Sequence, residues 1–339
     1  MLGLTRLGMS MTVEVLLSLA PPDGTTKFVD QLTEGKHVDT QYRYFSWRTA
    51  LLGRYQVFHV HWPEQLVRAP GALTQIVKRI LFRLLLLRFK LSGIAVVRTL
   101  HNLQPHEEGD SVERRLLGKL DAATQLNIRL NAATPMDEST GVTILHGHYI
   151  GRYPGVEPTD VRVGRLLYFG LIRPYKGVER LLDIFQSIQD DTKTLRVVGR
   201  PTPELRSLIE AVCEQDERVS ARLQFVPDDV LASEIYASEL VVLPYKEMHN
   251  SGAILVALSL ARPVLAPRSP TNELLAEEVG PGWVNMFDGD LSEAKLLAVL
   301  EEVRSLQRNP PKLSGRDWGV VGRQHHAAYL RAIELRKAS

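Results

Sequence analysis

The chain has 339 residues, of which 44% are hydrophobic and 24% charged, a composition typical of a folded globular protein. Its length suits two domains rather than one. Its 41 Lys and Arg residues nearly balance 39 Asp and Glu residues, so the net charge of +2 disfavours a nucleic-acid-binding function. The single cysteine, Cys213, excludes an internal disulfide framework and cysteine-based metal sites, and indicates a reducing compartment, the cytoplasm.

Short β-branched runs recur along the chain, each followed by a loop and a helical pattern, which predicts an α/β protein with parallel sheets. Residues 1–10 lack the apolar core of a signal peptide and are left out of the predicted fold. The predicted strands of the first half are Thr12–Ser18, Gln56–His61, Ile94–Leu100 and Gly141–Leu145. Those of the second half are Arg165–Phe169, Thr194–Val198, Leu223–Val226, Leu240–Pro244, Pro263–Ala266 and Trp283–Asn285.

These strands are too many for one ordinary sheet, and they divide around Arg152–Val163, a segment with two prolines and a glycine that is typical of a linker. We therefore predict two Rossmann-like domains, residues 11–153 and residues 160–316, which face a central cleft. Helical spacing in Asp317–Arg336 predicts a C-terminal helix within residues 317–339, crossing back to the N-terminal domain.

Histidines stand where strands of the first half end. His59 and His61 alternate with apolar residues and therefore point to one face of their strand, and His101 ends the next one. A metal site from these three residues is conceivable, but no carboxylate partner is evident and we expect no metal. The alternative for His101 is an ordinary bond to a neighbouring carbonyl group.

Two further segments of the first half are candidates of lower rank. Gly24 lies in a loop before a predicted helix, where it either approaches a ligand or belongs to a capped helix start. His146, His148 and Tyr149 close the first domain and either line the cleft or serve the fold.

The segment Ala72–Leu91 combines five cations, no acid and many apolar residues. A helical projection gathers Lys78, Arg79, Arg83 and Lys90 into one arc that also contains apolar residues. Such a helix either rests on an anionic membrane or packs on the sheet with a solvated basic edge. No stretch of 18 uncharged apolar residues occurs, so a transmembrane span is not expected.

Two strand exits in the second half carry groups suited to a diphosphate. Gly170, Arg173 and Lys176 follow the strand Arg165–Phe169 and lie just before a helix. After the strand Leu240–Pro244, the chain supplies further polar and small residues at the start of a helix that Ser251 can cap, namely Glu247, Asn250, Ser251, Gly252 and Ala253. Ligands of parallel sheets bind at such exits. The alternative is a pair of ordinary loops with solvated cations.

Together these two blocks resemble the nucleotide-sugar domain of GT-B glycosyltransferases, specifically the GT4-type, or group 1, family. In that family a G-x-x-x-x-x-K-G loop precedes a helix, here Gly170–Gly177, and a P-V-[VL]-A strand follows the second helix, here Pro263–Ala266. The resemblance covers roughly residues 165–267 and points to a divergent branch similar to bacterial exopolysaccharide glycosyltransferases. It implies donor binding by Gly24, Gly170, Arg173, Lys176, Glu247, Asn250, Ser251, Gly252 and Ala253, and catalytic roles for His101, Arg173 and Lys176.

The sequence departs from this family at its E-x7-E motif. Met248 and Val256 stand at the two glutamate positions. Glu247 is expected to substitute for the first glutamate, and nothing evident replaces the second.

The resemblance implies an enzyme that transfers a hexose from a nucleoside diphosphate sugar, with mannose from GDP-mannose as the first expectation. The implied acceptor is a saccharide, free or linked to polyprenyl diphosphate, at the inner face of the cell membrane. Metal-independent transfer with retention of configuration is also implied; His101 would orient the donor sugar, or act as base if this branch inverts. A nucleotide-sugar epimerase of the same fold and a non-catalytic partner subunit are the alternatives.

Overall fold

The computed structural model describes residues 12–338 except 25–26, 102–108, 247 and 306–308. Contacts divide the chain into an N-terminal unit, which contains residues up to Gly147 and from Arg316 onward, and a C-terminal unit, His148–Gly315. The division falls just before the predicted linker. The segment after Gly147 joins the second unit because Tyr149 and Tyr153 are buried in that unit's core.

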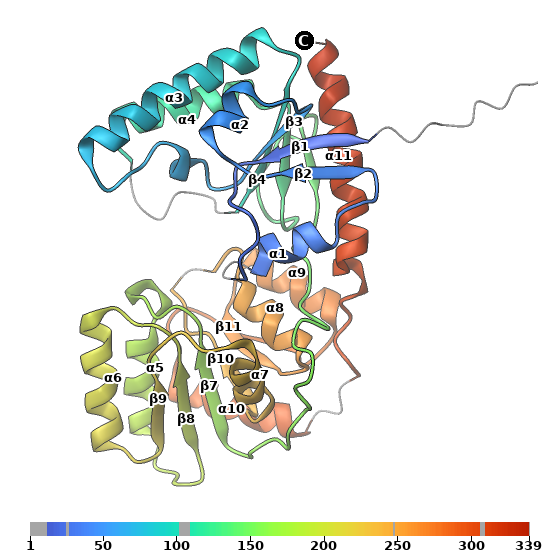
Figure 1. Ribbon diagram of the computed structural model, residues 1–339. Coiled ribbons are helices and arrows are strands. Elements are labelled where there is room, and N and C mark those ends of the chain that lie inside the picture. The colour runs from blue at the N-terminus through green and yellow to red at the C-terminus, as the bar shows by residue number, and fades with distance from the viewer. Residues whose placement is uncertain (1–11, 25–26, 102–108, 247, 306–308, 339) are drawn as a thin grey trace, which may run out of the picture. The chain divides into compact units, whose positions relative to one another are not determined.

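The N-terminal unit is built on a six-stranded parallel sheet with the order β2-β1-β3-β4-β5-β6. Figure 1 labels β1 to β4 of this sheet. The strands are β1 Val13–Leu17, β2 Thr40–Arg43, β3 Val57–Val60, β4 Ala95–Leu100, β5 Leu126–Arg129 and β6 Gly141–Thr143. The helices are α1 Lys27–Glu34, α2 Trp47–Leu52, the 3-10 helix η1 Pro63–Leu66, α3 Ala72–Leu91, α4 Ser111–Ala123 and α11 Trp318–Ala338.

Each face of this sheet has its own core. On one face Phe82 and Leu85 of α3 and Leu120 of α4 pack with strand residues of alternating positions. On the other face α1 and α11 cover the sheet, and Tyr329 is completely buried. The predicted C-terminal helix that returns to the N-terminal domain is thereby confirmed, because α11 packs against β1, β3, β4 and β5.

The return helix approaches the rest of its unit closely. A Cβ atom on Gly322 of α11 would lie 1.9 Å from the carbonyl oxygen of Gly35, which follows α1. Any larger residue at position 322 would therefore push α11 away from α1.

The C-terminal unit contains a second six-stranded parallel sheet with the order β12-β11-β10-β7-β8-β9. Its strands are β7 Arg165–Phe169, β8 Thr194–Val198, β9 Val219–Arg222, β10 Leu240–Val242, β11 Val264–Pro267 and β12 Val284–Phe287. Its helices are η2 Pro174–Lys176, α5 Val178–Ser187, α6 Pro203–Gln215, α7 Asp228–Tyr236, α8 Gly252–Ser259, α9 Pro270–Val279 and α10 Glu293–Ser305, and η3 Ser314–Arg316 leads into α11.

The prediction of two parallel Rossmann-like sheets is confirmed, but three strands differ from it. Strands β2 and β5 were not predicted, because each is only four residues long and mixes polar with apolar residues. The strand predicted at Leu223–Val226 is wrong: β9 is Val219–Arg222, and Leu223 and Val226 are buried just after it.

Candidate active site

The exits of β7 and β10 are neighbours, because these strands pair in parallel with Leu240 opposite Leu166. The Nζ atom of Lys176, in the loop after β7, lies 3.2 Å from the hydroxyl oxygen of Tyr245, which follows β10. The same ammonium group lies 4.8 Å from the centroid of the Tyr245 ring. The structure thus joins the two predicted donor loops through a tyrosine that the sequence analysis did not single out.

The backbone of the first loop is held against the second. Gly177 adopts a left-handed conformation with φ of 67°, and a Cβ atom there would lie 2.1 Å from the carbonyl oxygen of Pro244. Only glycine meets both requirements at this position. The final glycine of the G-x-x-x-x-x-K-G pattern is therefore needed for the close approach of the two loops.

The two predicted cations of this loop have different surroundings. Burial, with the nearby charge of Arg173 as a second cause, lowers the pKa of Lys176 to about 8. The Nη1 atom of Arg173 donates hydrogen bonds to the carbonyl oxygen of the preceding residue, Ile172 (2.8 Å), and to that of Arg200 in the loop after β8 (3.1 Å). Lys176 is thus a partly desolvated cation, whose attraction to an anion is stronger than in water.

The start of α8 forms the second wall of this site. Ser251 occupies the N-cap position, but its side chain makes no capping hydrogen bond, contrary to the prediction. It instead hydrogen-bonds the hydroxyl of Tyr245. A Cβ atom on Gly252 would lie 3.3 Å from the Tyr149 hydroxyl oxygen. The backbone of the predicted donor segment therefore passes close to the Tyr149 hydroxyl group at Gly252.

Carboxylates are missing from the two positions where the resembled family has them. Met248 is 7% exposed and its sulfur accepts a hydrogen bond from the Asn272 side chain, and Val256 is 8% exposed inside α8. Asn250 is half-buried beside this segment, and Glu247 lies outside the described residues. Both glutamate positions therefore belong to the core of the C-terminal unit.

In the N-terminal unit, His61 and His101 follow the neighbouring strands β3 and β4 and form a pair. The Nδ1 atom of His61 lies 2.9 Å from Nε2 of His101. Trp62 stacks on His101 with ring centroids 4.2 Å apart and an interplanar angle of 20°. Its φ of 43° is rare for a residue other than glycine, and such strained residues cluster at functional sites. Trp62 was not singled out from the sequence, where the H-x-H-W run was the available signal.

These histidines are neutral at physiological pH. Burial lowers the pKa of His101 to about 3 and that of His146 to about 4. Burial, followed by the charges of neighbouring histidines, also places the pKa of His59 and His61 well below the ordinary value. Hydrogen bonds at this edge therefore involve neutral imidazole rings.

His59 has a structural role. Its Nδ1 atom lies 2.8 Å from the Tyr329 hydroxyl of α11, and its Nε2 atom lies 2.8 Å from the Thr99 hydroxyl of β4. The Tyr329 hydroxyl is also 3.2 Å from that of Tyr42. This buried network ties α11 to the middle of the sheet.

The remaining sequence candidates lie at the start of α1 and the end of the N-terminal unit. Gly24 has φ of 78°, and its N–H group donates to Asp30 Oδ1 of α1 at 3.3 Å. His146 Nδ1 lies 2.8 Å from the carbonyl oxygen of Gly147. The N–H group of Gly24 is thus bound to the first turn of α1, and its role in donor binding stays a prediction.

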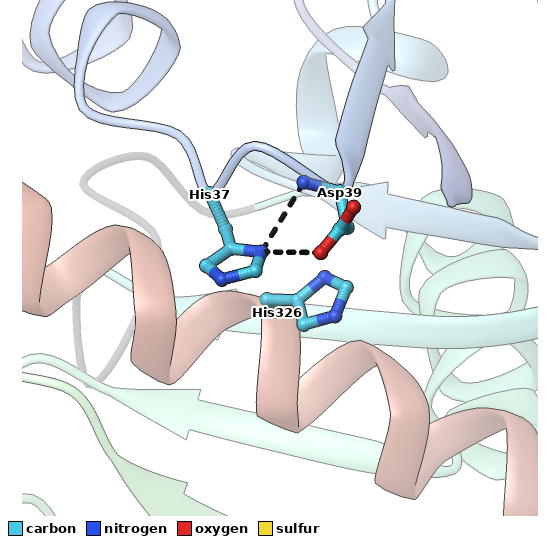
Figure 2. A group of neighbouring side chains, drawn as sticks. All are labelled: His37, Asp39 and His326. Carbon is cyan, nitrogen blue, oxygen red and sulfur yellow. Dashed lines mark hydrogen bonds and ion pairs between the residues drawn. The ribbon is translucent and has the colours of Figure 1, made fainter. Parts of the chain in front are cut away.

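One group among the described residues brings three metal-ligating side chains together, and it lies away from the strand exits. His37, Asp39 and His326 offer ligand atoms within 4.8 Å of one another (Figure 2). His37 Nδ1 lies 3.6 Å from Asp39 Oδ2 and accepts the Asp39 N–H group, and the two imidazole rings stack with centroids 4.4 Å apart. Stacked rings direct their lone pairs along similar planes rather than toward one point, so we assign no metal to this group.

The fold matches several solved structures over nearly the whole chain. Anabaena HepE in complex with UDP has a TM-score of 0.60, 13% identity, and coverage of 96% of this chain and 98% of that one. The lipopolysaccharide outer core galactosyltransferase WaaB has a TM-score of 0.61, 11% identity, and coverage of 94% and 99%. WaaG, a glycosyltransferase of lipopolysaccharide biosynthesis, has a TM-score of 0.57, 15% identity, and coverage of 96% and 99%. The fold is therefore that of the GT-B glycosyltransferases.

Sequence comparison identifies the family within the GT-B glycosyltransferases to which the chain belongs. Residues 163–301 match the family model described as Glycosyl transferases group 1. Over 335 residues the chain is 49% identical to a GDP-mannose:glycolipid 4-beta-D-mannosyltransferase of Xanthomonas campestris pv. campestris, covering 98% of this chain and 96% of that protein. A second sequence with the same name from that organism matches equally well. The chain belongs to the group 1 glycosyltransferases.

Proposed function

We propose that this protein transfers mannose from GDP-mannose to a glycolipid, a saccharide on polyprenyl diphosphate, in the synthesis of a cell-surface polysaccharide or glycolipid. The observation that carries this proposal is the 49% identity, over 98% of the chain, to proteins named for that reaction. The likeness includes both units, so it extends to the part of the chain that would hold the acceptor as well as the donor.

The donor loops support departure of a nucleoside diphosphate without a metal ion. As the sugar–phosphate bond breaks, negative charge grows on the leaving diphosphate and must be stabilised. Lys176 presents an ammonium group beside Tyr245, and α8 begins at Gly252 with its N-terminal N–H groups close by. We assign Lys176 to the diphosphate, with Arg173 as a weaker contributor because its guanidinium group binds loop carbonyl groups.

For the stereochemistry we propose inversion, in place of the retention implied by the resemblance to GT4-type enzymes. The relatives' name specifies a β-mannoside product, and GDP-mannose in its ordinary form carries an α-linked mannose. Conversion of an α donor to a β product needs attack from the opposite face of the sugar. The absence of carboxylates at positions 248 and 256 is in keeping with a departure from the retaining pattern.

His101 is assigned an orienting role rather than that of general base. A base works best when the pKa of its conjugate acid lies near the working pH. Burial lowers the pKa of His101 to about 3, which leaves little driving force for proton removal. The ring is held by His61 and Trp62, so it is suited to positioning a sugar hydroxyl.

Membrane contact through α3 is proposed from the outer face of that helix. Apolar residues recur there every three or four positions and are between 47% and 78% exposed, namely Leu73, Ile76, Val77, Ile80, Leu84, Leu87 and Leu91. We call this set the α3 stripe. It lies opposite the buried Phe82 and Phe89, so α3 is apolar on two faces. Such a surface suits a peripheral protein at the cytoplasmic side of a membrane that holds its acceptor.

No helix among the described residues combines the length and apolarity needed to cross a bilayer. The α3 stripe is therefore tested as a surface contact. Changing Ile80, Leu84 and Leu87 together to serine should abolish flotation of the protein with lipid vesicles. The exposed Phe225 of the C-terminal unit, changed to serine, is the control. Equal flotation of wild-type protein and the triple variant would refute the contact.

The reaction itself is tested with labelled GDP-mannose and a lipid-linked saccharide extract. Label should enter the lipid fraction from GDP-mannose and not from UDP-glucose. The product should be cleaved by a β-mannosidase and resist an α-mannosidase. Cleavage by the α-specific enzyme would overturn inversion, and label that stays water-soluble would overturn the glycolipid acceptor.

A further inference from the structure

A pocket of about 780 Å³ lies in the N-terminal unit, where the C-terminal parts of α3, α4 and α11 come together. Ile94 and Gln125, which precede β4 and β5, contribute to its lining, so it lies at the amino-terminal edge of the sheet. His61 and His101 lie at the opposite, carboxyl-terminal edge. The pocket thus lies at the other edge of this sheet from the two histidines.

The cations of α3 divide into two groups according to their partners. Lys78 donates to the carbonyl oxygens of Gln65 and Arg68, Arg79 pairs with Asp110, and Arg88 binds backbone carbonyl groups and stacks on Tyr55. Within the described part of the chain, Arg83 and Lys90 have no ion pair. These two exposed cations both line the pocket.

Neighbouring helices add two further cations. Lys119 of α4 is exposed, lines the pocket and has no ion pair with any described residue. Arg336 of α11 is anchored by hydrogen bonds to the carbonyl oxygens of Phe89 and Ser92 at the end of α3. No carboxylate is among the described residues that line the pocket. The four cations of this described lining make a local positive potential suited to a phosphate group.

The same pocket has apolar walls that continue into the exposed face of α3. Leu86, Leu87 and Leu335 contribute to its lining. Leu87 also belongs to the α3 stripe, and Leu91 extends that stripe beyond the pocket. A ligand that fits must therefore be anionic at one end and apolar at the other.

We propose that this pocket binds the phosphate headgroup of an anionic phospholipid, with Arg83, Lys90 and Lys119 around the phosphate and the acyl chains along the α3 stripe. The inference rests on the membrane contact proposed above and deepens it: α3 supplies apolar insertion, and the pocket supplies selection for anionic lipid.

The test compares vesicles of phosphatidylcholine with vesicles that also contain phosphatidylglycerol. The pocket variant changes Arg83, Lys90 and Lys119 to glutamine. The control changes three exposed cations of the same unit outside the pocket, Arg48, Arg54 and Arg115, so that both variants lose the same net charge. Wild-type protein and control should prefer the anionic vesicles by about tenfold or more, and the pocket variant should lose that preference.

If both variants lose the preference for anionic vesicles equally, the proposed lipid site is overturned, because the effect then comes from the overall charge of the protein. A second measurement uses short-chain, monomeric phosphatidylglycerol in calorimetry and needs no bilayer. Binding that is lost in the pocket variant supports the inference even if the α3 stripe fails to dock. If wild-type protein binds inorganic phosphate as tightly as it binds phosphatidylglycerol, the pocket is a site for a free anion, and the proposal of a phospholipid ligand is overturned.

Mannosyl transfer to a detergent-solubilised acceptor separates this inference from the proposed function. The pocket variant should transfer mannose at the wild-type rate under those conditions, because the pocket lies at the edge of the N-terminal sheet opposite His61 and His101. Absence of transfer by wild-type protein would contradict the function while leaving the lipid result intact.

Discussion

The ammonium group of Lys176 lies 3.2 Å from the hydroxyl oxygen of Tyr245 and over the ring of the same residue. Tyr245 also hydrogen-bonds Ser251 at the start of α8. One tyrosine therefore links the cation after β7 to the helix that follows β10. An anion bound by Lys176 would lie beside the N-terminus of α8, where a diphosphate is further stabilised.

Replacing Lys176 with alanine should lower the rate of mannosyl transfer by about two orders of magnitude, because the leaving diphosphate loses its cation. The rate is measured as label transferred from GDP-mannose per unit of folded protein. Lys246 is exposed and lies in the neighbouring loop, so Lys246→Ala is the matched control and should leave the rate nearly unchanged. A Lys176→Ala enzyme of near-normal rate would remove Lys176 from the reaction.

Replacing Tyr245 with phenylalanine should weaken GDP binding by up to about tenfold while leaving the fold intact. The ring that packs against Lys176 remains, but the hydroxyl group that hydrogen-bonds both Lys176 and Ser251 is lost. Calorimetric titration with GDP gives the affinity, and a double-mutant cycle with Lys176→Ala tests the coupling. Strictly additive effects of the two changes would show that Tyr245 does not act through Lys176.

GDP affinity should fall as the pH rises above about 8. The pKa of Lys176 is lowered to about 8 in the free protein, chiefly by burial, so the ammonium form is progressively lost above that pH. A bound diphosphate favours the charged form and raises the pKa, so binding above pH 8 should take up a proton. Titrations in buffers of different ionisation enthalpy measure this uptake. Lys176→Arg, which stays protonated, should show none, and absence of uptake by wild-type protein would be contrary evidence.

Replacing Gly177 with alanine should destabilise the donor loops by more than strain alone. An alanine at position 177 would have an unfavourable positive φ, and its Cβ atom would also collide with the Pro244 carbonyl oxygen. Gly155 has φ of 77° with open space around it, so Gly155→Ala carries the strain, about 1 kcal/mol, without the collision. Urea unfolding and GDP affinity should both be more affected at position 177. Equal effects at the two positions would mean that the loop after β7 moves enough to avoid the collision with Pro244.

The protein should lose stability as the pH falls from about 6.5 toward 4. Burial lowers the pKa of His101 to about 3 and those of His146 and His325 to about 4, whereas histidines of the unfolded chain bind protons near their ordinary pKa of 6.5. The unfolded state therefore gains protons first, and each such histidine removes up to about 1.4 kcal/mol of stability per pH unit in that window. Urea unfolding at a series of pH values measures the slope. A flat profile between neutral pH and pH 5 would show that these rings are accessible to solvent protons in the folded state.

Short-range patterns in the sequence were sufficient for much of this fold. The run of apolar residues followed by Gly170 and Gly177 predicts a strand, a turn and a helix in that order, because each step depends on residues close together in the chain. The helical spacing of residues 317–336 predicts α11 in the same way. The cations Arg173 and Lys176 were found for this reason, since they are part of a local pattern.

Contacts between distant segments decided the rest. Tyr245 lies 69 positions from Lys176, and Tyr329 lies 270 positions from His59, so neither partnership leaves a local signal. The cations of α3 are a second case, because a helical projection of the sequence does not distinguish those that have partners from those that do not. Packing against α2, the start of α4 and the segment around η1 gives Lys78, Arg79 and Arg88 partners within the protein. It leaves Arg83 and Lys90 at a pocket. Local residue preferences determine which segments become strands and helices, whereas charge pairing and burial depend on which of those segments become neighbours.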